Sequence, residues 1–451
     1  MSNAHRTVLC LAFAILSGGC GGDGNTGVSG NGSSGGSSSG GGTPNATVAS
    51  VNAASKAPAA APCGGFQGLV VFGDSLSDDG AYTSYALSIY GPGTADNIAF
   101  NGLPYLAGGQ YTVNGAATGN WTGVLASALG LTLTPNIVGY DFGGSIGTTY
   151  LVPGGASVTS ATQAICAFNS APSGHGPDCT NFAQGGAMVS SPIGVGNPGD
   201  LTYPLTQQVQ NYLTQFSAFE PNQLVTVLAG NNDIISAVEV LAEQMYAAGA
   251  AALAQTPSLT SAQVAQVETN VMTQQLPAIQ TAINTAADEL AAQAQLILKS
   301  GGAYVLVATL PDVSLTPLGQ ASSVPLDSSA TTCNNQDSSQ LCFAISGLVQ
   351  SFNRRLLNDL QGSNVKVIDG FTLLNQEIAN PSNYGFTNVT LRWCNTLSAL
   401  PCNVTTPNSD FGASTSNLAT WLFADSVHPT PAGYQVLCGT VLSSMHGFGW
   451  H

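Results

Sequence analysis

Short apolar runs alternate with longer amphipathic stretches from Cys63 to the end of the chain. Four of these runs end on small or polar residues, as buried strands that lead into turns do. Their Val, Leu and Ile residues are continuous rather than alternating with polar ones, which is typical of parallel strands covered on both faces. The four predicted strands lie in GLVVFGD (68–74), QLVTVLAGNND (223–233), AYVLVATLPD (303–312) and NVKVIDG (364–370).

The stretches between the predicted strands have helical composition. The Ala- and Gln-rich segment from Ile234 to Lys299 predicts two or three helices, which the Gly301-Gly302 pair would end. ISGLVQSFNRRLLNDLQG (345–362) predicts the helix before the fourth strand, and PAGYQVLCGTVLSSM (431–445) predicts the last helix. Strands alternating with helices predict an α/β fold, a three-layer sandwich. Sites in such sheets lie beyond the carboxyl ends of the strands.

The N-terminus has the pattern of an export signal. Arg6 precedes the apolar run VLCLAFAIL (8–16), which is shorter than the roughly 20 residues that span a bilayer. We therefore predict a signal peptide over residues 1–20. Cys20 stands where a bacterial lipoprotein would carry its lipidated cysteine, although Leu16 precedes it by four positions where a lipobox has three. The alternative is cleavage by an ordinary signal peptidase nearby.

Composition divides the rest of the chain and limits its partners. Gly, Ser, Ala and Pro dominate residues 21–62, which predicts a flexible linker before a single domain over 63–451. Charged residues make up only 7% of the chain, and the net charge is −16 with seven Lys and Arg together. Such a surface repels phosphate backbones, so we expect no nucleic-acid partner. A membrane tether is expected only through a lipidated Cys20. The expected location is that of an exported bacterial protein: an outer-membrane lipoprotein, a periplasmic protein or a secreted one.

The cysteine pattern indicates an oxidising compartment. Eight cysteines remain beyond the signal, and six of them bracket short segments rich in Gly, Ser, Asn or Pro. Spacing cannot fix the connectivity, so the pairings are guesses. They are Cys166–Cys179, Cys333–Cys342, Cys394–Cys402 and, by joining the two ends of the domain, Cys63–Cys438. No CxxC motif or histidine at ligand spacing accompanies them, and we predict no metal or cofactor.

Four segments carry residue types used in nucleophilic catalysis. Ser75 follows the first predicted strand, and GNND (230–233) follows the second. NFAQGGA (181–187) contains paired glycines, and Asp425 precedes His428 by three residues. A serine hydroxyl is a weak nucleophile that needs a nearby base, for which histidine with a carboxylate partner is the usual choice. A three-residue step across a turn lets Asp425 reach Nδ1 of His428 while Nε2 faces outward.

Ester hydrolysis also needs hydrogen-bond donors for the developing oxyanion. Ser75 is predicted to open a turn into a helix, which would leave its own N–H free. Gly186 has no side chain and can bring its N–H close, and Asn232 offers a side-chain N–H. Each residue alone has a simpler explanation: Ser75 as a helix N-cap, the glycines as a turn, Asn232 as a turn residue. Their combination favours chemistry.

The order of these segments resembles the GDSL, or SGNH, family of serine esterases and lipases. FGDSLSDDG (72–80), NFAQGGA, GNND and DSVHP (425–429) are similar to its four blocks. VATLPDVSLTP (307–317) and DGFTLLNQEIANPSNYGFTNVT (369–390) resemble segments of its bacterial secreted lipase and phospholipase-like branch. The resemblance implies the flavodoxin-like SGNH-hydrolase fold, a three-layer α/β/α sandwich with a short parallel sheet.

The same resemblance implies the site. Ser75 would be the nucleophile, His428 the general base and then acid, and Asp425 the residue that orients His428. The N–H groups of Ser75 and Gly186 and the side chain of Asn232 would form the oxyanion hole.

These observations predict an exported carboxylic-ester hydrolase that acts on lipid or simple acyl esters through an acyl-enzyme. Polysaccharide O-acetylesterase and acyltransferase activities on the same scaffold are the enzymatic alternatives. A non-catalytic surface-binding protein is the alternative outside the enzyme class. The sequence leaves the oligomeric state open.

Overall fold

The computed structural model describes residues 45–81, 110–137, 180–195, 202–321, 333–400 and 402–451, with the backbone of short strands between 139 and 167. Its centre is a parallel sheet in the order β1-β8-β9-β10. The four strands have the predicted places, with bounds Gly68–Gly73, Gln223–Leu228, Tyr304–Ala308 and Val365–Ile368. Gly73 pairs with Leu228 in the register of β1 and β8, so both strands end at one edge.

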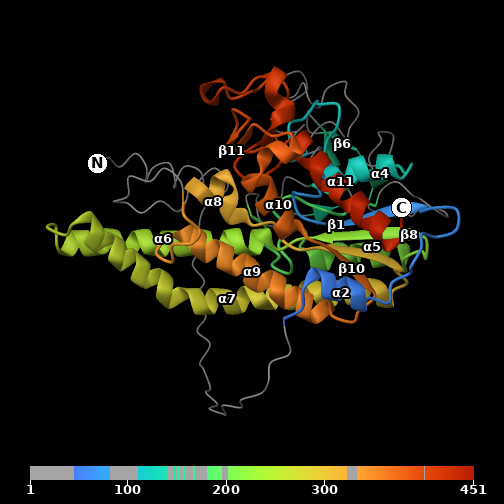
Figure 1. The fold of residues 1–451 in the computed structure, drawn as a ribbon, viewed down its shortest axis with the longest axis horizontal. Helices are drawn as coiled ribbons and strands as arrows, with labels where there is room; N and C mark the ends of the chain where they lie inside the picture. The colour runs from blue at the N-terminus through green and yellow to red at the C-terminus, as the bar shows by residue number, and fades with distance from the viewer. Residues whose placement is uncertain are drawn as a thin grey trace, which may run out of the picture.

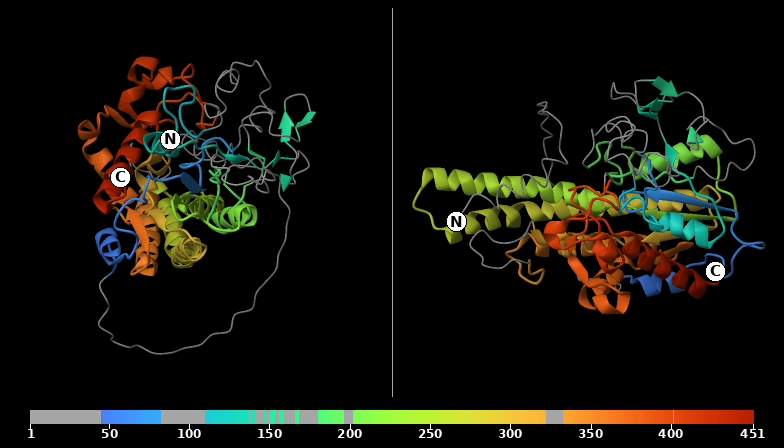
Figure 2. Two further views of the ribbon diagram at one scale, coloured as in Figure 1. Left: turned by 90° about the vertical axis from the view of Figure 1, so that its right-hand side faces the viewer. Right: turned by 90° about the horizontal axis from the view of Figure 1, so that it is seen from above.

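Helices cover both faces of this sheet, as Figures 1 and 2 show. On one face lie α5 (Leu205–Phe216), α6 (Asn231–Gln255), α7 (Ser261–Lys299) and α9 (Leu341–Leu360). On the other face α4 (Trp121–Ala128) packs with α11 (Pro431–Phe448). The predicted α/β/α sandwich with a short parallel sheet is therefore confirmed.

Smaller elements surround the sandwich. They are α8 (Pro317–Ala321), α10 (Gly370–Ala379), the 3-10 turns Val313–Leu315, Pro381–Tyr384, Ser409–Phe411 and Thr415–Thr420, and the pair β11 (Asn388–Arg392) and β12 (Trp421–Phe423). Further two-stranded pairs are β2 (Asn136–Ile137) with β7 (Cys166–Ala167), β3 (Gly139–Tyr140) with β4 (Ile146–Gly147), and β5 (Tyr150–Val152) with β6 (Ala156–Val158). No helix within the described ranges is both long and apolar enough to cross a membrane.

The predicted linker over 21–62 is wrong for its last part, because α2 (Val48–Ala54) belongs to the folded domain. Thr47 begins this helix with a capping box, and Val51 is fully buried in the core. The Asn52 side chain donates to the Val367 carbonyl at 2.8 Å and accepts from the Val367 N–H at 2.7 Å. This amide pairs with edge strand β10 as a further strand would, a tertiary contact that local composition does not encode.

Two of the guessed disulfides form, Cys333–Cys342 and Cys394–Cys402. The guessed Cys63–Cys438 pair is wrong: both thiols are free, since Cys63 is exposed while Cys438 lies in the core on α11. Burial raises the pKa of the Cys438 thiol to about 11. The Cys166–Cys179 pair and the candidate lipidation site Cys20 lie outside the described side chains.

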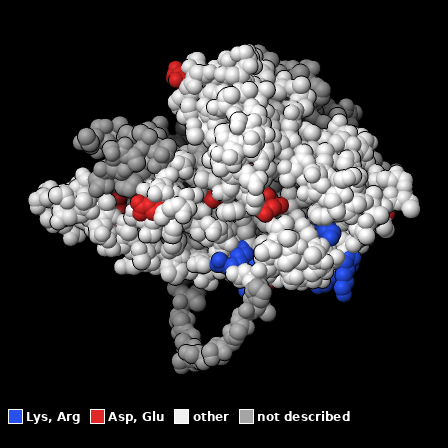
Figure 3. All heavy atoms as spheres, in the orientation of Figure 1, with Lys and Arg blue, Asp and Glu red and all other residues white. Residues whose placement is uncertain are grey.

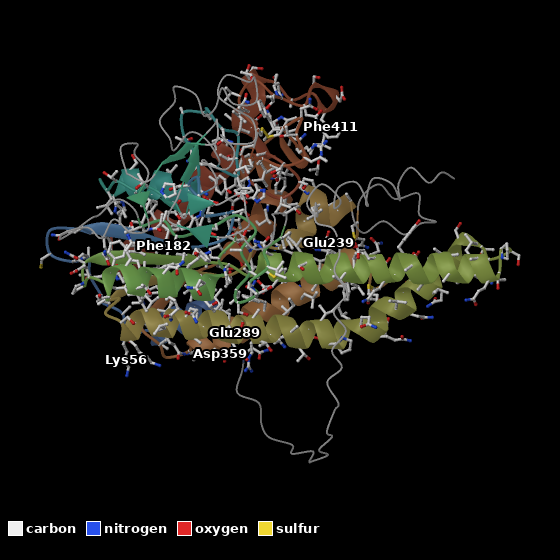
Figure 4. The ribbon with its side chains drawn as sticks, turned by 180° about the vertical axis from the view of Figure 1, so that it is seen from behind. Lys56, Phe182, Glu239, Glu289, Asp359 and Phe411 are labelled. Atoms are coloured by element: carbon white, nitrogen blue, oxygen red, sulfur yellow. A yellow bond between two sulfur atoms is a disulfide. The ribbon has the colours of Figure 1, made fainter. Side chains whose placement is uncertain are left out.

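Charged side chains contribute little to the packing. Figure 3 shows that charged residues are sparse on the face it presents. Seen from behind, Asp359 of α9 lies near α7 (Figure 4). Arg355 of α9 pairs with Asp359 of the same helix and with Asp288 of α7. Such exposed pairs contribute about 0–1 kcal/mol each, so the fold depends on its apolar core.

Aromatic packing fixes the strand that carries the candidate nucleophile. The ring of Phe72 on β1 contacts those of Phe182, Tyr212 and Phe219. Phe182, labelled in Figure 4, belongs to a segment that runs parallel to β1, since its N–H donates to the Val71 carbonyl at 2.8 Å. The end of β1 and the residues after Phe182 are thereby held side by side.

A glutamine of α5 completes the hydrogen bonds at the end of β1. Oε1 of Gln208 accepts from the Gly73 N–H at 2.9 Å, and its Nε2 donates to the Gly73 carbonyl at 2.8 Å. The Gln208 side chain is only 1% exposed. A buried backbone donor without a partner costs about 1–3 kcal/mol, so this amide stabilises the strand end.

We therefore expect Gln208→Leu to lower the free energy of unfolding by about 2 kcal/mol, because the buried Gly73 N–H would lose its acceptor. Urea denaturation measures this change. Gln210→Leu, on an exposed position of the same helix, is the matched control and should change stability by less than about 0.5 kcal/mol. Equal stability of the two variants would contradict the role given to Gln208.

Candidate active site

The chain turns sharply after β1. The Ser77 N–H donates to the Asp74 carbonyl at 3.0 Å, and the Leu76 N–H donates to the Asp74 carboxylate at 3.0 Å. Asp74 therefore braces the turn that presents Ser75. The helix expected after Ser75 is absent from residues 76–81, which form turns and bends. Ser75 is thus no helix cap, and its N–H donates to no group in the described part of the chain.

The predicted triad residues meet although 353 positions separate Ser75 from His428. Nε2 of His428 lies 2.7 Å from Oγ of Ser75. Nδ1 of the same ring lies 2.7 Å from Oδ2 of Asp425. Asp425 and His428 lie in the loop between β12 and α11. A hydroxyl, an imidazole and a carboxylate therefore form one continuous chain of hydrogen bonds.

Asp425 is held as a hydrogen-bond acceptor. Its Oδ1 accepts the backbone N–H groups of Val427 and His428 at 2.8 and 2.7 Å. Burial alone would raise the pKa of Asp425, but the neighbouring His428 and these N–H donors outweigh burial and lower the pKa below its usual value. The charged form that can stabilise an imidazolium is therefore favoured.

A disulfide loop supplies a further donor to this carboxylate. The Ala399 N–H donates to Oδ2 of Asp425 at 2.7 Å, and Ala399 lies between the bonded cysteines Cys394 and Cys402. The side chain of Asn114 donates to the carbonyl of Cys402 at 2.9 Å, which ties the loop to a distant segment. Nothing in the sequence pattern connected this loop with Asp425.

The predicted glycine turn lies beside the end of β1. The Gln184 N–H donates to the Gly73 carbonyl at 3.1 Å, and the paired glycines follow directly. Gly186 has φ of 78°, and a Cβ there would lie 2.1 Å from the Val195 carbonyl oxygen, so only glycine fits. Its N–H donates to no group in the described residues.

Asn232 lies in the first turn of α6, next to the glycine turn. Its Nδ2 donates to the Ala187 carbonyl at 2.9 Å. An amide nitrogen carries two hydrogens, and the second donates to nothing within the described ranges. Three N–H donors, from Ser75, Gly186 and Asn232, therefore lie at the carboxyl edge of the sheet without a partner among the described residues. The segments that carry Ser75 and Gly186 meet at Gly73, and Asn232 is joined to the glycine turn through the Ala187 carbonyl.

Tyr111 is a residue of this site that the sequence did not indicate. Its ring centroid lies 4.9 Å from that of His428, and a Cβ added to Gly185 would lie 2.2 Å from its ring atoms. Tyr111 therefore packs between the imidazole and the glycine turn. A single tyrosine in a polar loop gives no signal that could have identified it.

Four carboxyl groups lie around the turn: Asp74, Asp78 and Asp79 are buried, and Asp233 is half-buried. Burial raises the pKa of each to about 7. None of the four pairs with Lys or Arg among the described side chains. The described residues also contain no group of three or more His, Cys, Asp or Glu side chains that could hold a metal ion. The turn therefore has acidic groups in its interior without compensating cations.

Comparison with known families matches residues 69–438 to the GDSL-like lipase/acylhydrolase family. The chain belongs to this family. The match contains all four motif blocks named above, so the GDSL assignment made from the sequence is confirmed.

A relative of this GDSL protein gives no further detail. An uncharacterized protein from the trpE-trpG intergenic region of Pseudomonas putida is 25% identical over 400 residues. The alignment covers 87% of this chain but 50% of that protein, so the chain spans half the length of its relative.

Asp79 gives a pH-dependent test of the buried acids. No backbone N–H donates to its carboxylate in the described part of the chain, and its polar neighbours are the side chains of Thr122 and Asn181. Burial raises its pKa from 3.8 to about 7, so between these values the folded state binds more protons than the unfolded state. Stability therefore falls as the pH rises through this window.

We expect Asp79→Asn to raise the free energy of unfolding at pH 8 by about 1 kcal/mol or more, and to leave it nearly unchanged at pH 3.5. Urea denaturation at the two pH values measures the difference. Asp410→Asn, at an exposed carboxylate, is the control and should give no such difference. If both variants show the same pH dependence as the wild type, Asp79 does not destabilise the fold.

Proposed function

We propose that this protein is a serine carboxylic-ester hydrolase with Ser75 as nucleophile. The observation that carries the proposal is the hydrogen-bond chain from Ser75 through His428 to Asp425. His428 is placed to take the Ser75 proton, and the carboxylate of Asp425 is placed to orient the ring and stabilise the imidazolium. The same three residues lie in the motif blocks FGDSLSDDG and DSVHP.

The proposed reaction has two halves. Oγ of Ser75 attacks the ester carbonyl while its proton moves to Nε2 of His428, and this proton then goes to the leaving alcohol as the C–O bond breaks. Water, deprotonated by His428, attacks the acyl-enzyme, and the acid is released as the proton returns to Ser75. In both halves the carbonyl oxygen becomes negative, and the three unpaired donors of Ser75, Gly186 and Asn232 would stabilise it.

We propose lipid or simple acyl esters as substrates. A small apolar pocket supports this choice, because Ile235, three residues after Asn232 on α6, helps to line it and no charged side chain is among its lining residues. Its free volume of about 20 Å³ is close to that of one water molecule, so an acyl chain would enter only as the lining side chains move apart. The N–H of Leu318, which also lines the pocket, donates to the Ser426 carbonyl at 2.8 Å, and this bond links the pocket to the loop that carries His428. The lining residues are Ile234, Ile235, Val238, Val313, Leu318, Gly319 and Ile345.

We further propose that the protein is exported. The Cys333–Cys342 and Cys394–Cys402 bonds support an oxidising compartment, where disulfides persist. The predicted signal peptide and a lipid tether at Cys20 are part of the same proposal and rest on sequence alone.

Replacing the nucleophile is the direct test. Ser75→Ala should reduce kcat on p-nitrophenyl butyrate by at least about 1,000-fold without loss of fold, because no other group can form the acyl-enzyme. A fluorophosphonate probe should label the wild type and leave this variant unlabelled. Ser77→Ala, two residues on in the same turn, is the control and should keep the label. Wild-type rates in Ser75→Ala would refute the proposed mechanism.

A chain-length series tests the substrate class. Ile235→Phe narrows the apolar pocket, so the ratio of octanoate to acetate kcat/KM should fall at least about 5-fold. Val240→Phe, on an exposed position of α6, should leave the ratio unchanged. A wild type active on acetate alone would instead favour the O-acetylesterase alternative, and an unchanged ratio in Ile235→Phe would exclude the pocket as the acyl site.

A further inference from the structure

Asp78 joins the nucleophile turn to the glycine turn. Its side chain is fully buried, three residues after Ser75. Oδ1 accepts the N–H groups of Gly80 and Ala81 at 2.8 and 2.6 Å. Oδ2 accepts the N–H of Gly185 at 2.8 Å, from a segment 107 residues away in sequence. One carboxylate therefore satisfies three backbone donors from two segments.

The bond to Gly185 restricts the neighbouring donor. The Gly186 N–H belongs to the planar peptide group that begins at Gly185, so its direction depends on how the Gly185 backbone is held. Asp78 holds the N–H of Gly185, and the Tyr111 ring packs against the same residue. On the far side, the Gly186 carbonyl accepts from the Val195 N–H at 2.8 Å. Glycine backbones are otherwise free to rotate, so these anchors decide where the Gly186 N–H points.

The adjacent Asp79 shows that burial of an acid does not by itself give this arrangement. Asp79 is as buried as Asp78, yet among the described residues no backbone N–H donates to its carboxylate, whose polar neighbours are the side chains of Thr122 and Asn181. The two neighbours thus differ in contacts rather than in environment. Asp78 is the one that contacts the glycine turn.

We propose that Asp78 is a positioning residue of the oxyanion hole, because its carboxylate fixes the Gly185 backbone and thereby the direction of the Gly186 N–H. The inference rests on the proposed ester hydrolysis. It adds a residue that is neither a member of the triad nor one of the three oxyanion-hole donors. It predicts an effect on the transition state, in which the carbonyl oxygen is negative, and little effect on substrate binding.

Asp78→Asn is the test, with Asp79→Asn as the matched control. An asparagine can keep one oxygen towards Gly80 and Ala81, but its NH₂ group then faces the Gly185 N–H, and two donors repel each other. For Asp78→Asn we expect kcat on p-nitrophenyl butyrate to fall about 100-fold, with KM within about two-fold of the wild type. The affinity for an alkyl boronic acid, which mimics the tetrahedral intermediate, should fall in parallel. Asp79→Asn should keep both constants within about two-fold.

Several results would overturn the inference. They are wild-type kcat in folded Asp78→Asn, an equal loss in Asp79→Asn, or a rise in KM with kcat unchanged. If Asp78→Asn does not fold by circular dichroism, Asp78→Ser, which keeps one acceptor oxygen, takes its place with the same expected loss. Failure of both to fold would make Asp78 a structural residue and also refute the inference. A wild type that neither turns over the ester nor reacts with the fluorophosphonate would instead refute the proposed function.

Discussion

The contact between Nε2 of His428 and Oγ of Ser75 depends on a single geometric constraint, the common carboxyl edge of the parallel sheet. Because β1, β8 and β9 are parallel, each delivers the residues after it to the same edge. β1 brings Ser75 there, and β8 brings Asn232. His428 comes from outside the sheet, from the loop before α11, and crosses from the far end of the chain to reach it. The site therefore forms only when the whole domain has folded.

Hydrogen bonding to backbone groups takes the place that ion pairs have in many proteins. The chain has only seven Lys and Arg, and none of these pairs with a buried acid in the part of the chain that the structure describes. Asp74, Asp78, Asp233 and Asp425 instead accept backbone N–H groups of turns and loops. Each such bond satisfies a donor that would otherwise be buried without a partner, so the acids define loop conformation where no regular secondary structure does. Gln208 and Asn114 do the same with amide groups.

The sequence was most informative where local pattern determines structure. The apolar runs located the four strands of the central sheet, and the motif spacing selected Ser75, Asp425 and His428. It failed where a contact depends on tertiary packing. α2 lies in a Gly- and Ala-rich stretch that becomes ordered because Val51 is buried and Asn52 pairs with β10. The Cys63–Cys438 guess failed because two cysteines at the two ends of a domain need not face each other in the fold. Cys63 is exposed, whereas α11 buries Cys438 in the core. The helix expected after Ser75 is a turn because Asp74 and Asp78 capture the N–H groups there.

The triad carboxylate shows why the remaining features could not be predicted. Local geometry explains three of the four hydrogen bonds of Asp425, since Val427 and His428 are its neighbours in sequence. The fourth donor, the Ala399 N–H, comes from the Cys394–Cys402 loop, and Asn114 holds that loop from a third segment. A family motif records the residues that react, whereas such supporting contacts are backbone groups whose side chains are unconstrained. Residues such as Ala399 therefore leave no trace in a motif even when the position of the catalytic carboxylate depends on them.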